Sequence, residues 1–500
     1  MSRRPLVIIG YGAAGAAAAI TADRLGAEIL ILEKQGPDAH SPSTRMSGGL
    51  IMSLTDAAAG TDYLDGCAGG MIPRAVSAAW AQRAVGLLDW LREIAPKLEL
   101  SVVGGAEQHD VSGASAVCVH QPGPPDGRLS ATSGAGRALY DALTSEVARR
   151  GVPVRWNSPA KRLTRSETGG VTGVELADGT WIAAEAVILT CGGYEFDEQM
   201  KQDFLRTYPV HFYGNPGNSG DGVRMAQALG ADLWHMNQMI GRAIGHFTLP
   251  DGQALGFIIT IGPPGYVITD KHGERFADES AQAGLLHGFY YDLLKFEHDS
   301  GDYPRVPCYW FFDERRRQAG PLTHTHIGAV GLGLYDWSQD NSAEIAAGWI
   351  HRGDTIEQAA RAAGVLDPAR AAASVAAYNA ACLSRDDSFG RPADTLVPLE
   401  EPPFYCVPLW PGGSNTSGGP RRNEFGQILD VYGTVIPGLY AAGELGQPLG
   451  LRYPADGSNL SEALCFGQIA AEAALTDAIA GRPPAAGSDS PASGAPRHTR

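Results

Sequence analysis

The sequence is poor in cysteine and lacks any paired cysteine motif. Its seven cysteines, among 500 residues, stand at positions 67, 118, 191, 308, 382, 406 and 465, without a C-x-x-C or C-x-x-C-H pattern. Haem, iron–sulfur clusters and structural zinc are held by cysteine motifs of this kind. We therefore expect none of these groups, and we expect reduced thiols, as in intracellular proteins.

Long apolar runs and basic clusters are also missing. No stretch approaches the ~18 to 20 apolar residues that a membrane span requires. The formal net charge of −16 would repel nucleic-acid phosphates, and the short basic run of residues 315–317 directly follows Asp313 and Glu314. We expect neither a membrane span nor a nucleic-acid partner.

A glycine-rich turn near the N-terminus predicts a dinucleotide site. Residues 6–9 form an apolar strand, Gly10, Gly12 and Gly15 follow, an alanine-rich helix comes next, and a second strand ends at Glu33. The three glycines permit a tight turn, backbone contact with a pyrophosphate, and close packing of helix on strand. The Glu33 carboxylate is placed to accept ribose hydroxyls.

The first residues also resemble an export signal, because Ser2-Arg3-Arg4 precedes the apolar strand. Cleavage there would discard the phosphate-binding turn, and charged residues soon interrupt the hydrophobicity. We therefore expect a cytoplasmic protein. With 44% hydrophobic and 19% charged residues, a chain of this length should form two or more domains.

A motif near the C-terminus predicts that the dinucleotide carries a flavin. Residues 438–444 read Gly-Leu-Tyr-Ala-Ala-Gly-Glu, and a glycine turn at 457 opens a helix of small residues. Glycines admit the ring, and a helix N-terminus faces its electron-rich edge. FAD is therefore the predicted cofactor. We predict non-covalent binding, because residues 44–49 contain no histidine, although His40 is not far upstream.

Three more small-residue stretches, at 43–49, 190–193 and 214–222, are predicted to lie near the cofactor. In the third, Ser219 or Asp221 is expected to cap the helix that follows. The residues predicted to contact FAD are Gly10, Gly12, Ala14, Gly15, Glu33, Lys34, Arg45, Met46, Ser47, Gly48, Gly49, Ala160, Cys191, Gly192, Gly193, Asp221, Gly443, Glu444, Ser458, Asn459 and Leu460.

Periodicity and turn residues predict the remaining elements. Residues 104–136 are expected to be irregular, and the tail from Arg482, rich in Pro, Ala, Gly and Ser, to be disordered. Helices are predicted over 136–150, 285–296, 341–363 and 368–383. Hairpins are predicted over 171–190 and 266–279, and a strand over 308–312.

Several motifs occur in a fixed order: GYGAAG, Glu33, TRMSGG, TCGG, NSGDG, RFADE, NTSGG, GLYAAGE and YPADGSNLSEALCFG. This set resembles the flavoprotein family of soluble fumarate reductases and 3-ketosteroid dehydrogenases over nearly the whole chain. The resemblance implies an α/β fold: a Rossmann-like FAD-binding domain with a parallel sheet at 1–244 and 411–478, interrupted by an α+β substrate-side cap domain at 245–410. Residues 479–500 would form a disordered tail.

The resemblance further implies hydride exchange between the flavin N5 and a C–C bond next to an electron-withdrawing group. Fumarate reductases place an arginine where this chain has Ala283 and a histidine where it has Asn415. Ketosteroid dehydrogenases carry Tyr-x-x-x-Gly, which Tyr453 and Gly457 match without a gap. This implies that Tyr453 and the Gly457 amide bind a substrate carbonyl, and it favours the ketosteroid dehydrogenase branch.

The catalytic base implied by that branch would also fall at Ala283. Tyr290 is the nearby candidate, with Tyr291 beside it, and core packing is the alternative for both. Arg452 is a candidate substrate anchor, with a surface ion pair as an equal alternative.

The roles of several other charged or ring-bearing residues are left open by the sequence. Arg242 and His246 either line the cleft or serve the structure, and Arg421-Arg422 is expected in a loop packed over the cofactor. His324 and His326 would share a strand face, but no third metal ligand is indicated, so we predict no metal site.

The leading hypothesis is an FAD-dependent dehydrogenase or desaturase of a C–C bond next to a carbonyl, in a largely apolar, ring-like or ketosteroid-like substrate. The alternative is a flavin-dependent reductase of an activated C=C bond. A third hypothesis, from another class, is a flavin-bearing electron-transfer component of a complex. The electron acceptor or donor is left open.

Overall fold

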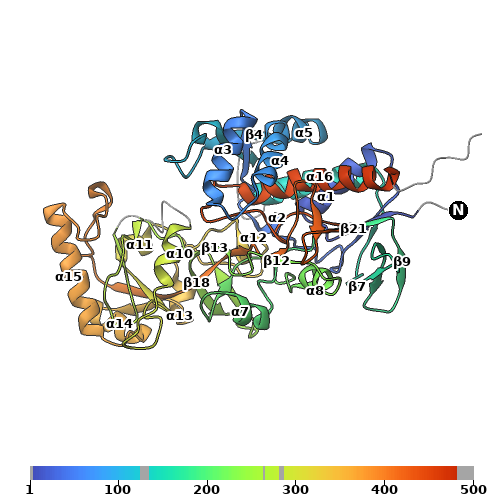
Figure 1. Ribbon diagram of the computed structural model, residues 1–500. Coiled ribbons are helices and arrows are strands. Elements are labelled where there is room, and N and C mark those ends of the chain that lie inside the picture. Colours follow the sequence, from blue (N-terminus) through green and yellow to red (C-terminus); the bar gives the residue numbers. More distant parts are fainter. Residues whose placement is uncertain (1–3, 124–133, 263–264, 281–286, 481–500) are drawn as a thin grey trace, which may run out of the picture.

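The computed structural model describes residues 4–123, 134–262, 265–280 and 287–480 (Figure 1). Ala283, which stands at the position of the family's catalytic base, lies outside these ranges. Residues 481–500, within the tail that was predicted to be disordered, also lie outside them. Across the described ranges, no helix has both the length and the apolar character needed to cross a bilayer.

A six-stranded sheet joins the two cofactor motifs of the sequence. Its strands, in spatial order, are β20 (Gln427–Leu429), β21 (Val435–Ala441), β10 (Ala186–Leu189), β1 (Leu6–Ile9), β2 (Ile29–Leu32) and β6 (Val154–Arg155). All neighbours are parallel except β20 with β21. The central strands are apolar and buried, as expected of a parallel sheet covered on both faces. Since β10 lies between β1 and β21, the sheet brings together segments more than 400 residues apart.

Helices α1 (Ala13–Arg24), α6 (Ala135–Arg149) and α16 (Ser458–Ala480) pack together beside this sheet. Figure 1 shows the red α16 along the blue α1. The contact between α1 and α16 is close because α1 is rich in alanine and α16 presents Gly467, where an added Cβ would lie 2.5 Å from the Ala14 carbonyl oxygen. A three-stranded sheet, β7 (Ala160–Arg165), β8 (Val171–Leu176) and β9 (Trp181–Ala183), contacts β10 and β21 through β8.

A second large sheet holds the middle of the chain. Its main order is β14 (Ala254–Phe257), β13 (Met239–Thr248), β18 (Phe404–Thr416), β16 (Cys308–Asp313) and β15 (Tyr266–Thr269). The short strands β11 (His211–Phe212) and β17 (His351–Gly353) also pair with β18. Its core is aromatic, with Phe247 stacked on Trp349 at 4.9 Å between ring centroids.

Most of the remaining elements are short, and α15 is the longest of them with 17 residues. Around the first sheet lie α2 (Ser43–Met46), β3 (Ile51–Leu54), α3 (Ala57–Ala68), α4 (Arg74–Val85), α5 (Leu87–Ile94), β4 (Glu99–Gly104), β5 (Val117–Gly123), α7 (Glu198–Phe204), α8 (Asp221–Gln227), β12 (Leu233–Trp234) and β19 (Gly419–Pro420). With the second sheet lie α10 (Gly288–Leu293), α11 (Glu314–Gln318), α12 (Gly328–Gly331), α13 (Ser342–Ala346), α14 (Ile356–Ala363) and α15 (Pro368–Ser384). Two 3₁₀ turns cover Ala114–Ala116 and Ala393–Thr395.

Three predicted elements were wrong. Residues 104–136 are not irregular throughout, because β5 pairs with β3 and β4. The helix predicted over 341–363 is divided into α13 and α14, since residues 351–353 instead pair with the edge of β18. The strand predicted over 181–190 breaks after residue 183, and its second half leaves the hairpin to pair with β1.

The predicted domain boundaries fall inside long strands. Residues 244 and 245 lie within β13, residues 410 and 411 lie within β18, and Ile244 is paired with Trp410. The chain therefore enters the second sheet through β13 and leaves it through β18, and these two strands pair with each other near the centre of Figure 1. The division into an FAD-binding part and a cap stays a prediction.

Candidate active site

A cavity opens at the carboxyl ends of β1, β2 and β10. It encloses about 1200 Å³ of space between atoms, part of it open to solvent. Its lining comes from the turn after β1, the end of β2, α2, the turn after β10, the loop before α8, and the segments that flank β21 and begin α16. Ligands of open α/β sheets bind at this edge.

The N-terminus of α1 faces this cavity and is built to bind an anion. Its N-cap, Gly12, has no side chain to cap the helix. The N–H of Ala13 donates to Thr44 Oγ1 at 2.9 Å, while those of Ala14 and Gly15 have no acceptor among the described residues. Free N–H groups and the helix dipole together favour a phosphate.

Glu33, at the end of β2, is held as a carboxylate. Its Oε2 accepts from the Tyr11 N–H at 3.0 Å, and its Oε1 accepts from the Gln35 N–H at 2.9 Å. Burial alone would raise the pKa of Glu33, but hydrogen bonds from His40 and from these N–H groups hold that pKa below its ordinary value. The ionised carboxylate is available to accept hydroxyl donors, as a dinucleotide ribose requires.

Lys34 and Asp221 form an ion pair across the mouth of the cavity. The distance from Lys34 Nζ to Asp221 Oδ2 is 2.6 Å, and Lys34 also donates to Ser219 Oγ at 3.0 Å. The predicted capping role was wrong: the N-cap of α8 is Gly220, which makes no side-chain cap. Asp221 and Ser219 instead connect the loop before α8 to the end of β2.

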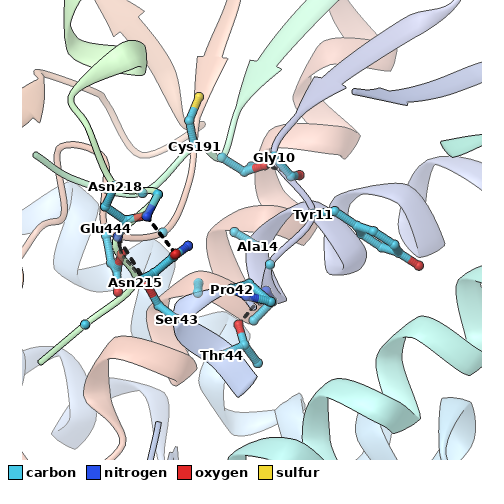
Figure 2. Close-up of a pocket in the computed structure, with 18 of the residues that line it drawn as sticks. Gly10, Tyr11, Ala14, Pro42, Ser43, Thr44, Cys191, Asn215, Asn218 and Glu444 are labelled. Carbon is cyan, nitrogen blue, oxygen red and sulfur yellow. Dashed lines mark hydrogen bonds between the residues drawn. The ribbon is translucent and has the colours of Figure 1, made fainter. Parts of the chain in front are cut away.

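Two buried carboxyls, Glu444 in the cavity lining and Glu195 near it, interact with each other. Glu444 Oε2 accepts from Asn218 Nδ2 at 2.9 Å and from Ser43 Oγ at 3.2 Å, and Figure 2 shows these three side chains pointing toward one another. The N–H of Thr416 donates to Glu195 Oε1 at 2.7 Å. Burial raises the pKa of both carboxyls, and the Glu195 charge further raises the pKa of Glu444. The pair therefore keeps a proton near neutral pH, which it can donate in a hydrogen bond.

Most residues predicted to contact the cofactor line this cavity, and the rest lie behind the lining. The lining ones are Gly10, Gly12, Ala14, Glu33, Lys34, Met46, Ser47, Ala160, Cys191, Gly192, Asp221, Gly443, Glu444, Asn459 and Leu460. Those behind it are Gly15, Arg45, Gly48, Gly49, Gly193 and Ser458. Gly49 and Gly193 are packed against other parts of the chain, and Arg45 donates to the His40 carbonyl at 2.7 Å.

Sequence reasoning missed several lining residues, among them Tyr11, Thr44, Asn218 and Tyr213. Thr44 and Asn218 stand in the TRMSGG and NSGDG stretches, so their motifs were a usable signal. Tyr213 stands in no motif that we singled out, and only the fold brings it to the cavity. Glu195 also stands in no motif, and it lies buried near Glu444 without lining the cavity.

Arg422 packs against the cofactor motif and is not among the residues that line the cavity, and the prediction that residues 421 and 422 form a loop over the cofactor stays a prediction. Its guanidinium is fully buried, pairs with Glu462 at 2.7 Å, and donates to the carbonyls of Ala441, Gly443 and Gly446. One side chain thus connects the end of β21, the turn that follows, and α16. This network fixes the backbone around Gly443 and Glu444.

The segment before α16 presents two polar groups that the fold leaves unused. Tyr453 Oη accepts weakly from the Asn459 N–H at 3.4 Å and has no acceptor for its own proton among the described residues. Burial, with the charges of Asp456 and Glu107, raises the pKa of Tyr453 well above its usual value, so the hydroxyl stays protonated. Gly457 has φ +83°, and its N–H likewise has no acceptor within the described ranges.

Arg452 and Tyr290 occupy different surroundings from those predicted for catalytic groups. The Arg452 guanidinium pairs with Asp110 at 2.8 Å on the exposed surface, as in the alternative interpretation. Tyr290 is 3% exposed in the core and packs on Gly241 of β13, and its hydroxyl has no partner among the described residues. Both placements favour structural roles.

Arg242, on β13, is a buried cation that forms no ion pair with any residue the structure describes. It is 7% exposed, and none of its nitrogens has a hydrogen-bond or ion-pair partner among the described residues. Its charge lowers the pKa of Glu107, Asp456 and His287. The guanidinium and two carboxyls therefore share one poorly solvated region, which also contains Tyr453.

The histidines considered in the sequence as metal ligands or cleft residues, His324, His326 and His246, instead make ring contacts with other histidines. Residues 324–326 form a turn rather than a strand, and the rings of His324 and His326 lie 5.8 Å apart. His246 stacks on His211 at 3.5 Å. In the part of the chain that the structure describes, no three His, Cys, Asp or Glu side chains are grouped to hold a metal ion.

The fold and the cavity define a dinucleotide-binding protein of the flavin-binding kind. A model of the FAD binding domain matches residues 6–460, and the chain belongs to this FAD-binding family. The cavity fits the cofactor: an open helix N-terminus for the pyrophosphate, an ionised Glu33 for the ribose, and room that small residues leave open. FAD is the cofactor of this site.

Characterised relatives include oxidoreductases of cyclic ketones. The chain is 31% identical to a 3-oxosteroid 1-dehydrogenase of Mycobacterium tuberculosis, over 68% of this chain and 62% of the relative. It is 28% identical to a 4-oxocyclohexanecarboxylate 2-dehydrogenase of Sinomonas cyclohexanicum, over 67% and 60%. In both comparisons the match spans less than two thirds of the relative.

A solved structure shares the fold. The 3-ketosteroid Δ1-dehydrogenase from Sterolibacterium denitrificans, in complex with 1,4-androstadiene-3,17-dione, superimposes with a TM-score of 0.80. The match covers 95% of this chain and 99% of that one, with 21% sequence identity. The predicted α/β class and the predicted flavoprotein family are therefore confirmed.

Proposed function

We propose that the protein is an FAD-dependent dehydrogenase that oxidises a C–C bond next to a carbonyl. One observation carries the proposal: the Tyr453 hydroxyl and the Gly457 N–H both lack acceptors in the described structure and lie just before α16, whose residues Asn459 and Leu460 line the FAD cavity. Two free donors on one turn suit a carbonyl oxygen.

The chemistry follows from these donors. A carbonyl oxygen that accepts two hydrogen bonds withdraws electrons from its α carbon, so the α C–H becomes more acidic. Tyr453 is suited to this task because its raised pKa keeps its proton in place as negative charge develops on the oxygen. Bound FAD supplies an acceptor for the hydride that leaves the neighbouring carbon.

A cyclic ketone is the substrate class that these residues support. The relatives named above act on a 3-oxosteroid and on 4-oxocyclohexanecarboxylate, which share a ring ketone. Reduction of a fumarate-like dianion has less support, because Asn415, at the place of a substrate-binding histidine, is fully buried and donates to neighbouring oxygens. Arg242 could balance only one of the two charges, and a dianion with one charge unpaired would be costly to bury.

Replacing Tyr453 by phenylalanine tests the proposal. Losing one of two carbonyl donors should lower kcat/KM for a cyclic ketone by about 10²- to 10³-fold, with FAD still bound. Steady-state kinetics and the flavin spectrum measure both effects. The control is Tyr432→Phe, because Tyr432 is 89% exposed and is not among the residues that line the cavity. A Tyr453→Phe enzyme with full turnover would remove the basis for a carbonyl-directed reaction.

A further inference from the structure

Glu107 is held against the segment that carries Tyr453. It follows β4, and its N–H donates to the Pro454 carbonyl at 3.1 Å. The next residue, Gln108, donates from Nε2 to the Tyr453 carbonyl at 3.2 Å and from its N–H to the Tyr63 hydroxyl at 3.1 Å. Tyr63 in turn donates to the Pro454 carbonyl. These bonds fix the position of Glu107 relative to Tyr453.

The Glu107 carboxyl itself has no structural partner. Its Oε1 is buried without a hydrogen bond, and neither oxygen has a hydrogen-bond or ion-pair partner among the described residues. A buried polar group left in this state costs stability. Since the backbone of Glu107 is tied down by hydrogen bonds while its carboxyl serves none, the side chain is free to act on a ligand.

The proposed reaction lacks a proton acceptor unless such a group is present. Oxidation of a C–C bond next to a carbonyl removes a proton from the α carbon as well as a hydride from the β carbon. Tyr453 cannot accept that proton, because its own hydroxyl stays protonated. Arg242, which has no partner among the described residues, is a cation and has no free electron pair to offer. Asp456 is the other carboxyl of the region. Glu107 is the better candidate because its Oε1 is buried without a hydrogen bond and its backbone is fixed to the segment that carries Tyr453.

We propose that Glu107 is the catalytic base that accepts the α proton of the ketone. This inference rests on the proposed function. The α C–H bond breaks, its electron pair forms the C=C bond of an enolate, and the proton forms an O–H bond with the Glu107 carboxylate. The enolate oxygen accepts hydrogen bonds from the Tyr453 hydroxyl and the Gly457 N–H. The β C–H bond then breaks and its hydride leaves for the oxidant that bound FAD would supply, while the enolate oxygen re-forms the C=O bond and the enolate electron pair forms the new double bond between the α and β carbons.

The charged groups around Glu107 are suited to a base that works near neutral pH. Burial and the Asp456 charge raise the pKa of Glu107, the Arg242 charge lowers it, and together they place this pKa at about 8. The other titratable groups that face it are Tyr63 and Cys67 on α3, and Tyr453. All three stay protonated at neutral pH because burial raises each pKa.

The test measures proton transfer apart from oxidation. The FAD-loaded protein is reduced and kept anaerobic, so that it accepts no hydride, and is mixed in D₂O with 4-oxocyclohexanecarboxylate or a 3-oxosteroid. NMR then follows deuterium entering the α position. Glu107→Gln should slow this exchange by about 10²- to 10⁴-fold, while Glu107→Asp keeps part of it. Glu99→Gln, on the exposed face of β4, is the matched control and should exchange like the wild type.

The pH dependence separates a base from a structural residue. In the wild type, exchange should rise with pH and reach half of its limiting rate near pH 8, as the Glu107 carboxyl loses its proton. Asp456→Asn removes a negative charge and should move this rise to lower pH, and Arg242→Met should move it to higher pH. Glu107→Gln should lose the rise altogether, with FAD content and Tm unchanged.

The outcomes distinguish this inference from the function on which it rests. If a saturated ketone bleaches the oxidised flavin but Glu107→Gln exchanges at the wild-type rate, the assignment of Glu107 is overturned and the proposed function stands. If exchange depends on Glu107 but no ketone bleaches the flavin, Glu107 is retained as a base and the dehydrogenation is overturned. A wild type that bleaches without exchange also overturns the Glu107 step.

Discussion

Arg422→Met should lower the free energy of unfolding by about 3–5 kcal/mol, because it leaves the Glu462 carboxyl buried without its cation. The ion pair is inaccessible to solvent and also satisfies three carbonyls around the cofactor motif. Urea unfolding of the FAD-loaded protein measures the loss. Arg421→Met is the matched control, since Arg421 is partly exposed and pairs with Asp232 at the surface. Exposed pairs contribute about 0–1 kcal/mol.

The loss in Arg422→Met should grow with pH. Burial raises the pKa of Glu462 to about 7 even with Arg422 beside it, and removal of the cation raises this pKa further. Both folded proteins therefore bind a proton at Glu462 that the unfolded chain releases at lower pH, and both lose stability as pH rises toward 7. Above about pH 7 only the variant continues to lose stability in this way, so the additional loss appears there. Equal destabilisation at pH 5 and pH 8 would contradict this account of the pair.

Gly15→Ala should weaken FAD binding by about 10- to 100-fold, although alanine is the better helix former. A Cβ at this position would lie 2.2 Å from the Gly10 carbonyl oxygen and 2.9 Å from Thr190 Oγ1. Helix α1 must then move away from β1, and overpacking of this kind costs about 1–3 kcal/mol. The displaced helix no longer directs its free N–H groups at the cofactor.

The measurement for Gly15→Ala is the FAD dissociation constant, obtained by titrating the apoprotein. Gly86→Ala is the control: it stands between α4 and α5, has a negative φ, and an added Cβ there meets its nearest atom at 4.0 Å. It should bind FAD as the wild type does. Wild-type affinity in Gly15→Ala would show that the contact between α1 and β1 is not needed to hold the cofactor.

The cofactor site could be predicted from sequence where its determinants are local. Gly10, Gly12 and Glu33 act through a turn and a strand end within about 25 residues, so strand, turn and helix signals locate them together. Thr416 and Glu195 are 221 residues apart, and their hydrogen bond depends on how two sheets meet. No local pattern indicates such a pair.

The substrate side was harder to predict for a related reason. Arg452 and Tyr453 are neighbours in sequence, yet one is exposed and pairs with Asp110, while the other is enclosed beside His287. An irregular segment has no period of 2 or 3.6 from which the direction of a side chain can be read. Glu107 lies in a loop that the sequence described only as irregular, and its contact with Pro454 belongs to the tertiary fold.

The central claim is that a saturated ketone gives its electrons to the flavin of this protein. Its most direct test is anaerobic mixing of the oxidised, FAD-loaded protein with a saturated cyclic ketone, with flavin absorbance followed over time. The account predicts that the flavin is bleached and that the unsaturated ketone appears in equal amount. A flavin that stays oxidised with every saturated ketone, while the reduced flavin is re-oxidised by an unsaturated one, would contradict it and assign the protein to reduction.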